Sequence, residues 1–140
     1  MTTEFTTLVQ ELRDLDLYLA VEADVQSGKV GVRMRIAPGV LAVAMPRLVV
    51  RPLVENAIRY GLAGKPGGGA VTIIAEDAGV EAVLTVEDDG VGMDPARVAE
   101  RSGLGDVDER MRSAFGLEYA LLVETAPDAG TKVTLRLPKG

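Results

Sequence analysis

The residues best suited to chemistry lie in the stretch Val86–Asp94, which reads VEDDGVGMD. Side chains alternate between the two faces of a strand, so Asp88 falls on the apolar face and Asp89 on the opposite one. An inward carboxylate is costly unless something donates hydrogen bonds to it. Gly90 and Gly92 let a ligand approach the backbone closely, so Asp88 could accept a hydrogen bond from an exocyclic amine such as that of adenine. The alternative is a structural Asp beside a glycine turn. The other residues of the apolar face are Val80, Ala82, Leu84 and Val86.

A second polar residue, Asn56, lies within PLVENAIRYGL at 52–62. Its helical spacing with apolar neighbours predicts that it faces the sheet. A buried amide oxygen could ligate a hard cation without the cost of burying a charge. Glu55 and Arg59 are four residues apart, and the alternative to a functional role is a surface ion pair of about 0.2–0.5 kcal/mol. The predicted stripe consists of Leu53, Asn56, Ala57 and Tyr60.

Two further places combine polar groups with glycines or an apolar face. The segment 101–105, RSGLG, opens a predicted helix, and the N–H groups of a helix N-terminus attract phosphates. The acids that follow offer the alternative of complementing the helix dipole. Thr131 places a hydroxyl on the apolar face of the last strand, where threonine otherwise reflects strand propensity. If this strand neighbours the one that ends at Asp88, hydroxyl and carboxylate could meet on the same ligand.

Composition excludes several kinds of site. The chain has 140 residues, 47% of them hydrophobic and 26% charged, which suits one globular domain. It has no histidine and no cysteine, so a Ser-His-Asp triad, a His base and zinc held by imidazole or thiolate are excluded. A bound metal would have oxygen ligands, which points to Mg²⁺ or Ca²⁺. The net charge of −6 argues against nucleic acid as a partner. Without a signal-peptide pattern or a long apolar run, we expect a cytoplasmic chain without membrane contact.

The elements that position these residues follow from periodicity and turn residues. We predict helices over about 4–26, 47–62 and 104–115, with Pro52 either kinking the second helix or starting its regular part. Strands are predicted over about 30–36, 70–77, 80–88, 118–125 and 131–137. Because the later strands are joined by hairpin-like turns, the predicted fold class is α+β: a two-layer sandwich with helices on one face of a mostly antiparallel, mixed sheet.

The order of these motifs resembles that of the GHKL (Bergerat-fold) ATP-binding family, which includes gyrase-type topoisomerases, heat-shock chaperone ATPases, MutL and histidine kinases. Asn56 matches the N box, and DDGVG at 88–92 matches the first glycine box. The region of Gly103 matches the second glycine box, and Gly130-Thr131 the last. PLVENAIRYGL, MPRLVVRPL at 45–53, DERMRSAFG at 108–116 and the segment 12–30 are more narrowly similar to LytS-type sensor histidine kinases.

This resemblance implies an ATP-binding catalytic domain at 28–140, preceded at 1–27 by the end of a dimerisation or linker helix. It implies that Asn56 ligates Mg²⁺, that Asp88 holds the adenine amine and that Thr131 supports this contact. Glu55 would stand where related ATPases activate a water. The implied catalytic residues are Glu55 and Asn56, and the implied ATP-binding residues are Asn56, Arg59, Tyr60, Asp88, Gly90, Gly92, Met93, Gly103, Leu104, Gly105 and Thr131. The chain departs from the family pattern at Tyr60, Arg101 and Asp106, and in a short lid between Gly92 and Gly103.

The implied function is that of a two-component sensor histidine kinase. The phosphoacceptor histidine must lie outside this chain, which has none. The implied partners are the phosphoacceptor and dimerisation segment of the same kinase, a response regulator and, in the full-length, membrane-anchored kinase, a second copy. Two alternatives are a stand-alone anti-sigma-factor-type Ser/Thr kinase of the same fold and a degenerate interaction module with weak or no nucleotide binding.

Overall fold

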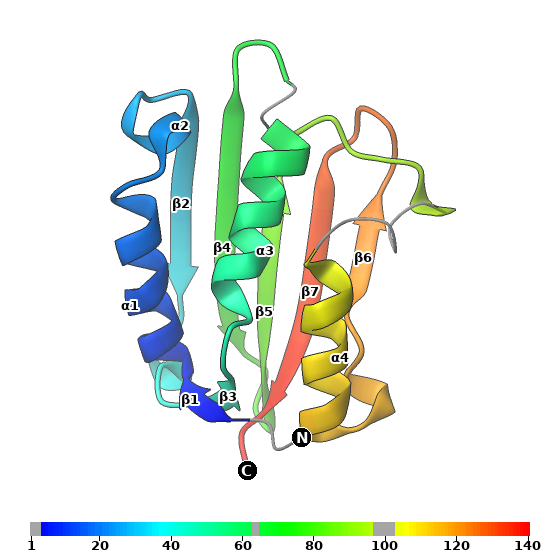
Figure 1. Ribbon diagram of the computed structural model, residues 1–140. Helices are drawn as coiled ribbons and strands as arrows, with labels where there is room; N and C mark the ends of the chain where they lie inside the picture. Colours follow the sequence, from blue (N-terminus) through cyan, green and yellow to red (C-terminus); the bar gives the residue numbers. More distant parts are fainter. Residues whose placement is uncertain (1–3, 63–64, 97–102) are drawn as a thin grey trace.

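The computed structural model describes residues 4–62, 65–96 and 103–140. Figure 1 shows one twisted sheet with helices α1, α3 and α4 packed side by side on one face. The sheet has five strands in the order β2-β4-β5-β7-β6. Strands β2 and β4 are parallel and the other neighbours are antiparallel, which confirms the predicted two-layer α+β fold. Its strands are β2 (Val30–Ile36), β4 (Gly69–Asp77), β5 (Glu81–Asp88), β6 (Leu122–Thr125) and β7 (Thr131–Pro138).

The helical layer follows from apolar stripes that the sequence repeats at helical spacing. The helices are α1 (Leu8–Leu19), the short α2 (Ala23–Gln26), α3 (Val50–Asn56), which continues as a π-helical segment (Ala57–Leu62), and α4 (Leu104–Phe115). Leu15 of α1, Leu53 of α3 and Met111 of α4 belong to one buried cluster with the inward residues of the sheet. The core therefore lies between the two layers. No helix within the described ranges is long and apolar enough to cross a membrane.

The predicted helix over 4–26 was too long at both ends. Residues Phe5–Thr7 form strand β1, which pairs with β3 (Ala44–Pro46) in a second, two-stranded sheet. The helix begins after Thr7, whose hydroxyl accepts a hydrogen bond from the N–H of Gln10. It ends at Leu19, and Glu22 caps the separate helix α2. The division of the chain at residue 27 stays a prediction.

The predicted strand over 118–125 begins later, at Leu122. Gly116 has φ +112° and is followed by a short 3-10 helix at Leu117–Tyr119; another, Pro38–Val40, follows β2. Asp108 of α4 accepts a hydrogen bond from the N–H of Leu121 at 2.9 Å, so this backbone bonds to a helix side chain rather than to a strand. The departure from the family pattern at Arg101 and residues 97–102 of the short lid lie outside the described residues.

Candidate functional site

Asp88 lies at the end of β5 and is buried, with only 5% of its surface exposed. Its Oδ1 accepts a hydrogen bond from the N–H of Gly90 at 2.9 Å. The β5–β7 register sets Asp88 directly opposite Thr131, which is also buried. Both expectations are confirmed: the carboxylate is on the inward face, and the last strand is its neighbour.

Gly61 in the π-helical segment brings a second chain segment against Asp88, a contact that was not predicted from the sequence. A Cβ on Gly61 would lie 2.6 Å from Oδ1 of Asp88. A Cβ on Gly90 would overlap the carbonyl of Gly61, which accepts a hydrogen bond from the N–H of Val91 at 2.9 Å. The signal in the sequence was a glycine inside an apolar helical pattern. Glycine costs a helix about 1 kcal/mol relative to alanine, so its presence there indicates that another segment packs closely against it.

Thr125, at the end of β6, joins three segments beside Asp88. Its hydroxyl accepts from the N–H of Met93 at 3.1 Å, and lies 2.9 Å from both the carbonyl oxygen of Gly130 and the hydroxyl of Thr131. Met93 therefore reaches the site through its backbone. Sequence reasoning missed Thr125, because only the strand pairing places it beside Thr131.

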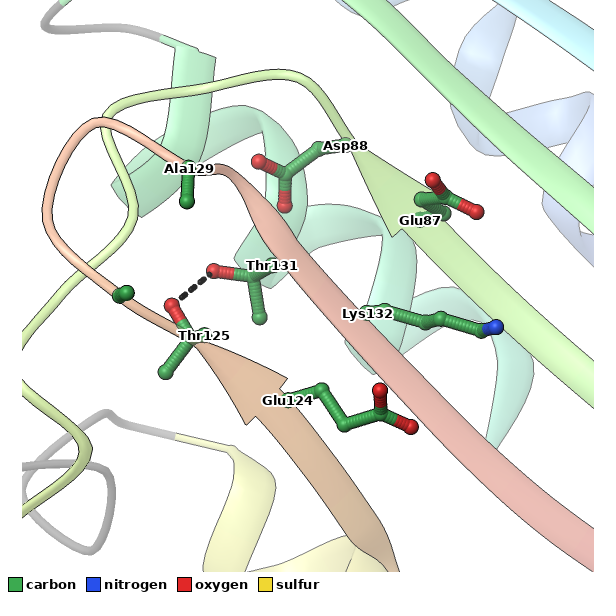
Figure 2. Close-up of a pocket in the computed structure, with 8 residues that line it drawn as sticks. Glu87, Asp88, Glu124, Thr125, Ala129, Thr131 and Lys132 are labelled. Carbon is green, nitrogen blue, oxygen red and sulfur yellow. Dashed lines mark hydrogen bonds between the residues drawn. The ribbon is translucent and has the colours of Figure 1, made fainter.

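Two hollows share Asp88 and Thr131. The first has a volume of about 280 Å³ and is lined by Glu87, Asp88, Glu124, Thr125, Ala126, Ala129, Thr131 and Lys132. Figure 2 shows the carboxylate of Asp88 and the two threonine hydroxyls gathered near the β6–β7 turn, while the side chains of Glu87 and Lys132 extend away from them. The second lies between the layers and has only about 10 Å³, room for at most about one water molecule.

This second hollow connects the sheet residues to α3 and α4. It is lined by Leu53, Asn56, Ala57, Val86, Asp88, Leu104, Thr131 and Val133. Leu104, the first residue of α4, is 4% exposed and closes it. A purine that reaches Asp88 from between the layers therefore requires this hollow to widen.

Asn56 ends α3 and is 6% exposed, as the predicted stripe required. Its Nδ2 donates a hydrogen bond to the carbonyl of Pro52 at 3.0 Å, whereas its Oδ1 is buried and has no hydrogen-bond partner among the residues that the structure describes. Buried polar atoms are nearly always satisfied, so this oxygen fits a ligand of Mg²⁺, a cation that prefers oxygen. No group of three or more Asp, Glu, His or Cys side chains that could hold a metal occurs in the part of the chain that the structure describes. The rest of the coordination shell would have to come from phosphates and water.

The residues around Asn56 differ partly from prediction. Pro52 lies in the first turn of α3, where its missing N–H breaks no helical hydrogen bond. Glu55 pairs with Arg51 at 2.7 Å instead of with Arg59, which is exposed. Tyr60 is 39% exposed, so its predicted place in the buried stripe was wrong. The π-helical turn adds a residue to the winding and turns Ile58, Gly61 and Leu62 inward instead.

At the second glycine box, Gly103 precedes α4 with φ +93°. A Cβ there would overlap the side-chain amide of Asn56, so α4 begins in direct contact with the end of α3. Gly105 is exposed, and a Cβ added to it would have no atom within 4 Å. A third hollow, of about 220 Å³, lies beside Gly103 and is lined by Leu48, Arg51, Pro52, Glu55, Gly103, Asp106, Val107 and Arg110. Glu55 and the two arginines Arg51 and Arg110 thus border one hollow between α3 and α4.

The family model described as histidine kinase-, DNA gyrase B-, and HSP90-like ATPase matches residues 43–140. The chain belongs to this family. It is an ATP-binding catalytic domain of the kind found in sensor histidine kinases, as the resemblance implied.

Two curated relatives of this histidine kinase-like ATPase domain are sensor kinases. Sensor histidine kinase BtsS of Escherichia coli K12 is 33% identical over 136 residues, which cover 97% of this chain and 24% of BtsS. Sensor protein LytS of Bacillus anthracis is 28% identical over 144 residues, which cover 94% of this chain and 24% of LytS. The chain thus spans about a quarter of the length of each relative.

Among solved structures, the nucleotide-free catalytic domain of histidine kinase ThkA superposes with a TM-score of 0.70 at 16% identity, covering 99% of this chain and 97% of that one. ThkA has also been solved in complex with response regulator protein TrrA, and that kinase chain matches with a TM-score of 0.69 at 14% identity, over 99% of this chain and 42% of its own. At these identities the likeness concerns the fold of the ATPase domain.

Proposed function

We propose that this domain binds Mg-ATP between α3, α4 and the sheet and presents the γ-phosphate to a histidine outside this chain. One observation carries the proposal: Asn56, Asp88 and Thr131 line the same hollow, and within the described part of the chain the buried Oδ1 of Asn56 has no hydrogen-bond partner. A hydrogen-bond acceptor for the nucleotide base, Asp88 on β5, and a cation ligand, Asn56 on α3, thus line one site.

Each wall would recognise a different part of the nucleotide. Asp88 would accept a hydrogen bond from the exocyclic amine of the base, supported by Thr131, and Gly90 and Gly92 would let backbone approach the ring. Asn56 would hold Mg²⁺ through Oδ1. Bound there, the ion would neutralise and orient phosphate oxygens, which is the main requirement of phosphoryl transfer. The start of α4, at Gly103, Leu104 and Gly105, would face the phosphates with its N–H groups.

The transfer itself requires a nucleophile that the chain does not contain. An imidazole nitrogen of the phosphoacceptor would form a bond to the γ-phosphorus, while the bond to the bridging oxygen breaks and ADP leaves with its electrons. Glu55 could take up the imidazole proton. Its side chain is 28% exposed and borders the hollow between α3 and α4. Arg59 and Tyr60 lie in the π-helical segment that follows α3 and remain predicted ATP-binding residues, with Arg59 expected near the phosphates.

The proposed partners follow from the same chemistry. The phosphoacceptor would belong to the dimerisation segment of the same kinase, in the same chain or in the second copy of a homodimer. A response regulator would then receive the phosphoryl group. The ThkA complex with TrrA supports a response regulator as partner.

Nucleotide titration of the domain tests the proposal. Saturating MgATP at about 100 times its Kd should stabilise the fold by ~2.7 kcal/mol, seen as a rise in melting temperature. Asp88→Asn should abolish this rise, and Asn56→Ala should remove the part that requires Mg²⁺. Asp89→Asn is the matched control, because the Asp89 side chain is 61% exposed and bonds instead to the N–H of Ala70. Absence of any ATP-dependent rise in the unmodified domain would refute the proposal.

A further inference from the structure

Glu11 is a buried carboxylate that lies outside the proposed nucleotide site. It belongs to α1 and has 4% of its surface exposed, although glutamate is rarely buried without partners. Its partners are three backbone N–H groups at the start of α3. Oε2 accepts from Leu48 at 3.3 Å, and Oε1 accepts from Val49 at 2.9 Å and from Val50 at 3.1 Å.

The backbone at this point is shaped to hold an anion. Leu48 has φ +61°, an unusual conformation for a residue with a side chain, and Val49 follows with φ −112° and ψ −53°. A left-handed residue next to a right-handed one turns successive N–H groups into one concavity that attracts negative charge. No side chain of α3 caps its own N-terminus, so Glu11, more than 35 residues earlier in the chain, supplies the cap.

A second contact joins the same two helices closer to the site. The guanidinium of Arg51 lies 5.0 Å from the ring centroid of Tyr18 on α1, and Arg51 also pairs with Glu55. Helix α1 therefore contacts the first turn of α3 at two points, through Glu11 and through Tyr18. Asn56 lies only six residues after Val50, so a shift of the first turn passes directly along this short helix to the amide.

We propose that Glu11 is a positioning residue for the phosphoryl transfer proposed above: by fixing the start of α3, its carboxylate holds Oδ1 of Asn56 at the hollow between the layers. The inference rests on the proposed function. A positioning role for Glu11 predicts different effects on base binding at Asp88 and on Mg²⁺ binding at Asn56, whereas a purely stabilising cap does not. Asp88 is held at the end of β5 by pairing with β7 and by the N–H of Gly90, so contacts to the base should survive the loss of Glu11 while contacts to Mg²⁺ weaken.

The experiment uses Glu11→Gln, Glu11→Asp and the control Asp16→Asn. Gln keeps one acceptor oxygen but turns an amide donor toward the three N–H groups, and Asp keeps the charge on a shorter arm. Asp16 is an exposed acid on the same helix. ATP affinity is measured with Mg²⁺ and with EDTA, well below every variant's melting temperature. In nucleotide-free protein, the side-chain amide NMR signal of Asn56 is followed as well.

We expect Glu11→Gln and Glu11→Asp to reduce the Mg²⁺-dependent gain in ATP affinity about tenfold, the size seen when a group that orients a metal ligand is removed. Their affinity in EDTA should stay unchanged, and the amide signal of Asn56 should move. Asp16→Asn should change none of these. If both Glu11 variants lower the melting temperature but keep the Mg²⁺ gain and the Asn56 signal, Glu11 is only a structural cap and the inference is overturned. If the unmodified domain binds no ATP, the proposed function fails first, and the inference fails with it.

Discussion

Replacing Gly61 by alanine tests the contact on which the base-binding wall depends. The new Cβ would lie 2.6 Å from Oδ1, 2.8 Å from Cγ and 2.9 Å from Oδ2 of Asp88. Non-bonded heavy atoms prefer about 3.5–4.0 Å, so the carboxylate or the helix must move by roughly 1 Å. Overpacking of this kind costs about 1–3 kcal/mol. Alanine in place of glycine stabilises a helix by about 0.8–1.0 kcal/mol, so the net destabilisation of the fold should be about 0–2 kcal/mol.

The effect on nucleotide binding should be larger than the effect on stability. A hydrogen bond to a charged group contributes about 1.5–3 kcal/mol, so displacing Asp88 should weaken ATP binding by roughly 10- to 150-fold. Urea unfolding measures the change in the free energy of unfolding, and isothermal titration calorimetry measures the change in ATP affinity. Gly31→Ala adds the same methyl to exposed β2, where its nearest neighbour would be at an ordinary 3.9 Å, and should bind ATP normally. Wild-type ATP affinity in Gly61→Ala would refute the role assigned to Asp88 and its surroundings.

Three further predictions concern single groups. Thr131→Val removes the 2.9 Å hydrogen bond to Thr125 and should lower the free energy of unfolding by about 1 kcal/mol in urea titration, while an unchanged value would mean that water replaces the bond. Burial, followed by the hydrogen bond to Glu22, raises the pKa of the Tyr18 phenol above its usual value of 10. The contribution of Tyr18 to stability is therefore present below pH 10 and is lost as pH rises through the raised pKa. In a pH titration followed by tyrosinate absorbance, one tyrosine should ionise at higher pH than the others, and Tyr18→Phe should remove that step. The hydrogen bond from Lys139, then that from the N–H of Gly79, lowers the pKa of Asp77. The contribution of Asp77 to stability is therefore present above the usual pKa of an aspartate and is lost as pH falls through the lowered pKa. An NMR titration of Lys139→Met should find the pKa of Asp77 moved back toward its usual value, with the Gly79 hydrogen bond still in place.

Much of the site could be predicted because it depends on local periodicity. Alternation along β5 places Asp88 inward, and alternation along β7 does the same for Thr131; both are buried as predicted. Helical spacing likewise places Asn56 toward the sheet. In each case an apolar face must be buried, and a polar residue that shares this face is carried inward with it.

What the sequence did not predict depends on contacts between distant segments. Strand β1 exists only because β3 pairs with it, about 40 residues later. The partners of Glu11 become visible only when α1 lies on α3. Tyr60 lies outward where the helix changes to π-helical winding at Ala57, in the same segment where Gly61 packs closely against Asp88. The near closure of the hollow by Leu104 is likewise a matter of packing between layers.

The meeting of Gly61, Gly90 and Gly130 around Asp88 has a consequence for how this chain can change over evolution. Three separate segments meet there, with the side chain of Asp88 against Gly61 and main chain against Gly90 and Gly130, and a Cβ on any of the three glycines would overlap another segment. Nearly every substitution at these positions must damage folding and ligand recognition together. Adaptation to a different nucleotide or a different partner is therefore confined to the residues that surround Asp88 and these three glycines, while the glycines themselves are retained.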